Sequence, residues 1–113
     1  MTRVEVRAGA CGFTALVEVA REDRGFRVSI RSECEMVRRL GARLPVSPAG
    51  RFAARFRENP VFEVADGCVA HPSCPVLVGV LKAVEVEAGA SLPAAVMIRF
   101  LDGGTVSGGH GSG

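Results

Sequence analysis

Three stretches of alternating apolar and polar residues near the start of the chain constrain the fold more than any other feature. They comprise residues 2–8, 13–20 and 26–31. Successive side chains of a strand point to opposite faces, so a period of two predicts strands with one buried face each. The first connection contains Gly9 and Gly12 and the second ends at Gly25, which is typical of turns and hairpins. We therefore expect a three-stranded antiparallel sheet over the first 31 residues.

The hydrophobic period changes after residue 31, which indicates helices. Ser32 opens an S-x-x-E capping box, so a helix is expected to start there. Ser47, followed by a proline, marks a second helix start. Phe52 and Phe56 lie four residues apart and are expected to anchor that second helix on the sheet.

A longer helix is predicted near the C-terminal end of the chain. Asn59 and the proline after it are expected to stop the second helix, and residues 61–64 form a short apolar link. Apolar residues then recur at helical spacing over residues 76–84, and Gly89 is a natural stop. Pro75 suits the first helical position, which predicts that the residue before it, Cys74, is the N-cap.

Residues 96–101 (VMIRFL) resemble a fourth strand that could join the sheet. The expected fold class is therefore α+β, with two layers: an antiparallel sheet of three or four strands and helices on one face. Residues 1–102 are expected to form a single domain. Six of the last eleven residues are glycine, so residues 103–113 are expected to be a flexible tail.

The composition limits the classes of function. With 113 residues, 48% of them hydrophobic and 23% charged, the chain has the composition of an ordinary globular domain. Its apolar runs are shorter than the ~20 residues of a membrane span, and its first residues carry no hydrophobic signal segment. We therefore expect the protein in the cytoplasm. Thiols stay reduced there, so four cysteines indicate metal binding, catalysis or packing before disulfides.

The charge distribution is less informative. The net charge is +2, but the segment from Met36 to Arg57 holds six arginines and no acidic residue. A solvated helical face explains this run best, and docking to an acidic partner is the alternative. The chain has no Trp and no Tyr, which disfavours the stacking used by single-strand nucleic-acid binders.

Cysteines and a histidine stand at the ends of the predicted elements. Cys11 follows the first strand, Cys34 opens the first helix, and His71 and Cys74 open the last one. Two antiparallel strands separate Cys11 from Cys34, and a strand out and a strand back return the chain to the same edge of the sheet. If the last helix points its N-terminus to that edge, the result is a Cys₃His set, a common ligand combination for Zn²⁺. Cys68 is a spare ligand. The positive ends of the two helix dipoles are expected to favour the thiolate forms of Cys34 and Cys74.

These motifs resemble the NifU/IscU-type iron–sulfur cluster scaffolds and their zinc-binding SufU relatives. Three features carry the likeness: Cys11-Gly12 between the first two strands, Cys34 after the third, and His71-Pro-Ser-Cys74 before a long helix. The likeness covers roughly residues 3–88. It implies a SufE/NifU-like fold, Cys11, Cys34 and Cys74 as ligands of a cluster or of zinc, and partners in cluster assembly or transfer.

The sequence also departs from that family. Phe13 stands where the scaffolds have an aspartate after Cys-Gly, the chaperone-binding LPPVK segment is absent, and there is no N-terminal helix. The strings CGF, SECE, HPSCPV and LKAVEVEAG resemble a small prokaryotic family of unknown function, which implies no activity.

The residues leave three functions open. The first is a metal- or cluster-binding protein, in which Cys11, Cys34 and Cys74 matter more than His71 or Cys68. The second is a thiol redox protein or an enzyme with Cys74 and His71 as a nucleophile pair, although no further side chain obviously orients the histidine. The third is a structural domain whose cysteines are small core residues. The first is favoured, and the protein is expected not to be an enzyme.

Overall fold

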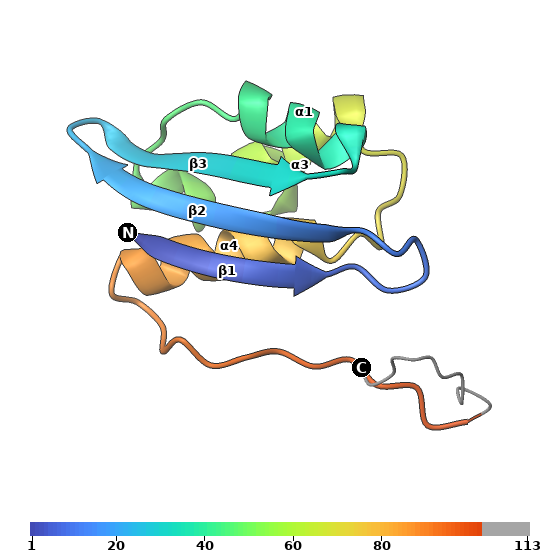
Figure 1. Ribbon diagram of the computed structural model, residues 1–113. Helices are drawn as coiled ribbons and strands as arrows, with labels where there is room; N and C mark the ends of the chain where they lie inside the picture. The colour runs from blue at the N-terminus through green and yellow to red at the C-terminus, as the bar shows by residue number, and fades with distance from the viewer. Residues whose placement is uncertain (103–113) are drawn as a thin grey trace.

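The computed structural model describes residues 1–102 and shows a two-layer α+β fold (Figure 1). One layer is a three-stranded antiparallel sheet of order β1-β2-β3, and the helices cover one of its faces. The elements are β1 (Thr2–Arg7), β2 (Thr14–Glu22), β3 (Gly25–Ser32), α1 (Glu35–Arg43), α2 (Ala49–Phe52), the short 3₁₀ helix η1 (Phe56–Glu58), α3 (Pro60–Cys68) and α4 (Val76–Glu87). The fold class expected from the alternation is confirmed.

The core lies between the central strand and two helices. Ala15, Val17 and Val19 of β2 are fully buried because the alternation turns all three toward the helices. α4 packs on β1 and β2, and α1 packs on β3. Gly79 of α4 lies so close to β1 that a Cβ atom there would be 2.5 Å from Cγ2 of Val6. The lack of a side chain therefore sets how closely α4 approaches the sheet.

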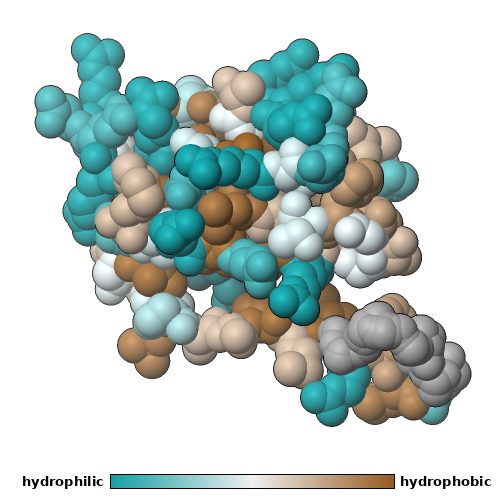
Figure 2. All heavy atoms as spheres, viewed as in Figure 1, coloured by the Kyte–Doolittle hydropathy of each residue, from teal (hydrophilic) through white to brown (hydrophobic). Residues whose placement is uncertain are grey.

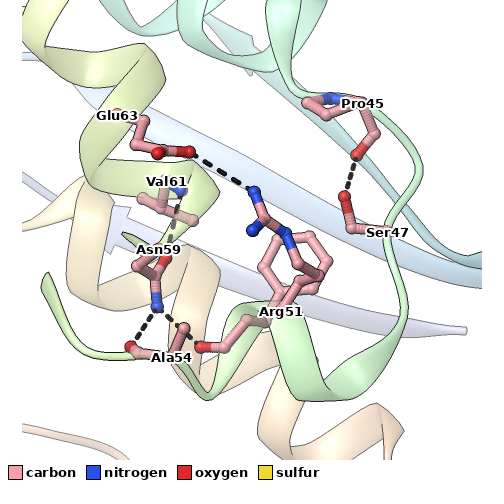
Figure 3. Close-up of polar contacts among 8 residues, drawn as sticks. Pro45, Ser47, Arg51, Ala54, Asn59, Val61 and Glu63 are labelled. Carbon is pink, nitrogen blue, oxygen red and sulfur yellow. Dashed lines mark hydrogen bonds and ion pairs between the residues drawn. The ribbon is translucent and has the colours of Figure 1, made fainter. Parts of the chain in front are cut away.

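Asn59 begins a helix that the sequence analysis did not predict. Its side-chain oxygen accepts a hydrogen bond from the Val61 amide at 3.1 Å, and Pro60 occupies the first turn of α3. Its amide nitrogen donates to the carbonyls of Phe52 (2.8 Å) and Ala54 (3.0 Å), as Figure 3 shows. A helical turn does end at this pair, as the sequence predicts, because Asn59 is the C-cap of η1. The expected apolar link over residues 61–64 is wrong, because an asparagine followed by a proline is also the N-cap and first position of a new helix.

Two other expected helix features differ in the structure. Ser32 is not a cap: it ends β3, and the N-cap of α1 is Cys34, without a side-chain cap bond. Phe56 does not anchor a helix on the sheet, since it is 75% exposed and its ring packs against Phe62 at a centroid distance of 5.1 Å. Phe52 is buried as expected.

The chain after α4 does not form the expected fourth strand. Within the described residues, 92–101 have no assigned secondary structure and pair with no strand. They run beside the domain as an extended ribbon, visible in orange to red in Figure 1 and as partly brown atoms below the domain in Figure 2. The prediction of a flexible tail at 103–113 lies outside the described residues. Across 1–102, no helix has the length and apolar character needed to cross a membrane.

Candidate functional site

Three of the four cysteines line one small cavity at the end of the sheet where β1 and β3 end and β2 begins. Cys11 comes from the β1–β2 loop, Cys34 from the start of α1, and Cys74 from the segment that leads into α4. The cavity has a volume of about 20 Å³, which is room for one water-sized atom or ion. The rest of its wall is mostly apolar and contains no charged side chain: Ala8, Phe13, Thr14, Ala15, Ser32, Val37 and Val76. All four cysteines are free thiols.

The position of Cys11 depends on two glycines. Gly9 and Gly12 have φ values of +92° and +79°, in the left-handed region that other residues rarely adopt. The loop closes through hydrogen bonds from Gly12 N to Gly9 O (2.8 Å) and from Ala8 N to Phe13 O (3.0 Å). Cys11 is exposed at its tip. Of the three cysteines that line the cavity, Cys11 is therefore the one that lies in a loop and is exposed to solvent.

Cys34 is held by the end of the sheet. The Ser32 hydroxyl donates to the carbonyl of Thr14 at 2.9 Å and accepts from the amide of Cys34 at 3.1 Å. Ser32 lies opposite Ala15 in the β2–β3 register, which brings it to the same edge as the Cys11 loop. The sequence analysis missed this role. The strand alternation through residue 31 could have revealed it, because it places Ser32 at the end of β3 rather than in a helix.

Cys74 lies at the N-terminus of α4, but Pro75 and not Cys74 is the N-cap. Burial raises the pKa of the Cys74 thiol, and the neighbouring thiols of Cys34 and Cys11 raise it further. Hydrogen bonds from the backbone amides of Val76 and Leu77 work in the opposite direction and lower this pKa. The expected easier deprotonation of Cys74 is therefore wrong, since removal from water outweighs the helix N-terminus.

The two remaining candidates lie apart from this cavity. Cys68 is in the last turn of α3, where its thiol donates to the carbonyl of Val64 at 3.3 Å and its side chain packs on the core. His71 is exposed in the link between α3 and α4. Neither lines the cavity. Among residues 1–102, no three His, Cys, Asp or Glu side chains are arranged to hold a metal ion as they stand, so a preformed Cys₃His centre is not observed.

A larger hollow of about 510 Å³ lies open to solvent at the β2–β3 turn. Its lining has no cysteine or histidine: Glu22, Asp23, Arg24, Arg27 and Val46. The smaller cysteine cavity is the better candidate because it gathers reactive side chains from three separate segments.

Comparison with known proteins identifies a family but no activity. The family model described as "Family of unknown function (DUF6951)" matches residues 2–100, and the chain belongs to this family. No curated protein and no solved structure matches the chain.

Proposed function

We propose that this protein binds a single soft metal ion through the thiolates of Cys11, Cys34 and Cys74, and carries that ion in the cytoplasm. One observation supports the proposal above all: three cysteines far apart in the sequence line one cavity of atomic size. Cys34 and Cys74 also pack against the hydrophobic core. Cys11 is exposed and contributes little to that core, so packing does not account for its position beside them.

The donor set fits a thiophilic ion. Thiolates favour Zn²⁺, Fe and Cu(I), and three of them leave a position for a fourth ligand on a tetrahedral ion. The cavity has room for one ion, so a mononuclear site fits more readily than an iron–sulfur cluster. Closure of the Cys11 loop would bring its sulfur to an ion between Cys34 and Cys74.

The fourth ligand would come from outside the cavity wall. His71 is exposed and lies three residues before Cys74, so it is a candidate, while Cys68 is engaged with α3. Water or a side chain of a receiving protein could fill the same position. Because Cys11 lies at the surface, a partner thiol could reach the ion and exchange with it, as transfer in metal or cluster assembly requires.

A Cys-His nucleophile has less support. His71 does not line the cavity that Cys74 lines, so no imidazole is placed there to take the proton of this thiol.

Metal content of the protein purified without oxygen tests the proposal. We expect close to one equivalent of bound metal per chain, reduced strongly in Cys11→Ala, Cys34→Ala and Cys74→Ala. Cys68→Ala is the matched control, a free thiol outside the cavity, and it should keep its metal. Circular dichroism checks that each variant is folded. Equal loss in all four variants, or metal retained by the three cavity variants, would contradict the proposal.

A further inference from the structure

The extended segment after α4 is strongly apolar, and it pairs with no strand among residues 1–102. Its six large apolar residues are between 57% and 84% exposed: Leu92, Val96, Met97, Ile98, Phe100 and Leu101. Within residues 1–102, its one backbone hydrogen bond is local, from Ala94 N to Leu92 O at 2.8 Å. A segment with this composition is costly to leave in water.

The segment has the pattern of a strand. Val96, Ile98 and Phe100 share one face, and Met97, Arg99 and Leu101 share the other. A strand is stable only when its backbone N–H and C=O groups are paired with a neighbouring strand.

β1 offers an open edge that fits such a strand. It pairs with β2 on one side, and no described residue pairs with its other side. On the helix face of this edge, Val4 and Val6 are only half-buried, and Val78 of α4 is 48% exposed. The edge therefore provides unpaired backbone groups beside apolar side chains.

The end of α4 is closed by a motif that fixes how the segment leaves the helix. Ala90 N donates to Glu85 O at 2.8 Å and Gly89 N donates to Val86 O at 3.0 Å, which is a Schellman motif with Gly89 at φ +78°. Figure 1 shows the ribbon leaving α4 and running separately from β1. The motif fixes the exit direction of the chain, and Pro93 stiffens the backbone just after it.

We propose that residues 95–101 of one copy add as a strand to the open β1 edge of a second copy, so that two chains form a strand-exchanged dimer. The chain carries both halves of this contact, and a two-fold exchange pairs both edges at once. The segment is part of the family's domain rather than an appendage, because the family match extends to residue 100.

The side chains agree with one register. In this register, Arg99 lies opposite Glu5 on the face of the sheet that the helices do not cover. Ile98 and Phe100 then lie beside Val4 and Val6 on the helix-covered face, whether the added strand is parallel or antiparallel to β1. The three inward residues of each segment bury about 250 Å². With the surfaces they cover, two segments bury about 1,000 Å², which reaches the lower limit for a specific dimer.

Molar mass in solution tests this proposal on the full chain. Sedimentation or light scattering should show a dimer at micromolar concentration. The double variant Ile98→Asp/Phe100→Asp should raise the dissociation constant by at least about 100-fold, since it places charges on the buried face of both strands. Both residues are exposed within the monomer, so the variant should keep its circular dichroism spectrum. Phe56→Asp is the matched control, an exposed aromatic outside the segment, and should remain dimeric.

Two results would overturn the proposal. One is a dimer that the double variant leaves intact. The other is a wild-type monomer. Amide exchange then shows where the segment goes: protection of residues 96–101 in a monomer means that the segment pairs with its own β1, and no protection means that it stays unpaired.

Discussion

Replacement of Asn59 by alanine should cause the largest loss of stability of any polar substitution in this chain. Asn59 is 2% exposed and makes three hydrogen bonds, two donated to the carbonyls of Phe52 and Ala54 and one accepted from the amide of Val61. They join α2 to the start of α3, as Figure 3 shows. Alanine leaves all three partners unsatisfied. At about 1 kcal/mol for each bond, the free energy of unfolding should fall by about 3 kcal/mol.

Urea unfolding measures this change. A fall of about 3 kcal/mol is a large part of the ~6–15 kcal/mol expected for a domain of this size, so the midpoint should shift well beyond error while the slope stays constant. Asn59→Asp separates the contributions, because it keeps the acceptor for Val61 and loses both donors. If the two donated bonds dominate, the aspartate variant should be about as unstable as the alanine variant.

The exposed ion pair between Arg51 and Glu63 provides the control. Its nitrogen and oxygen atoms lie 3.4 Å apart, and the pair appears beside Asn59 in Figure 3. Arg51→Ala should cost less than about 0.5 kcal/mol. A loss below about 1 kcal/mol for Asn59→Ala, or an Arg51→Ala loss of similar size, would refute the reasoning.

Three further predictions concern packing and titration. Gly79→Ala should lower the melting temperature, because the new Cβ would lie 2.5 Å from Cγ2 of Val6 and push α4 away from the sheet. An unchanged melting temperature would show that the Val6 side chain moves aside instead. The pKa of the Glu87 carboxyl is lowered, first by the hydrogen bond that it accepts from Thr2. The carboxylate therefore stabilises the fold at pH values above the ordinary glutamate pKa, and this contribution is lost as the pH falls through the folded-state pKa. Glu87→Gln should make the free energy of unfolding less dependent on pH in the acid range, and an unchanged dependence would exclude this contribution. The pKa of the Cys74 thiol is raised, first by burial, so its contribution to stability is present below the ordinary thiol pKa and is lost as the pH rises through the folded-state pKa. In the metal-free protein, the pH dependence of Cys74 alkylation should give an apparent pKa above that of a free thiol. An apparent pKa below that of a free thiol would contradict the role of burial.

The sheet was predictable because its signal is local. Alternation depends on near neighbours, and the register of β1, β2 and β3 follows from two short connections. The same logic placed Cys11 and Cys34 at one edge, which explains why residues 23 positions apart line one cavity.

The helix starts were harder to predict because the same residues serve two purposes. Asn59 and its proline both end one helix and begin another. Ser32 matches a capping box, yet its hydroxyl joins Thr14 to Cys34 across the sheet edge. A short motif does not reveal which of two partners a hydroxyl will choose, since the competing partner is distant in sequence.

Residues 96–101 carry a real strand pattern that the described chain does not use within its own sheet. Periodicity shows that a segment can pair, but it does not reveal whether its partner is in the same molecule. The raised pKa of Cys74 was missed for a related reason: the helix N-terminus is visible in the sequence, whereas burial depends on the packing of Val37 and Val76 around the cavity.

X-ray absorption at the zinc edge of the zinc-loaded protein tests the central proposal most directly. Zinc bound in the cysteine cavity should show three sulfur neighbours at about 2.3 Å, with one lighter atom completing the shell. Cys68→Ala should leave that spectrum unchanged, while Cys34→Ala should remove a sulfur or abolish binding. A shell of nitrogen and oxygen atoms without sulfur, or a spectrum that depends on Cys68 and not on Cys34, would contradict the assignment of Cys11, Cys34 and Cys74 as the metal site.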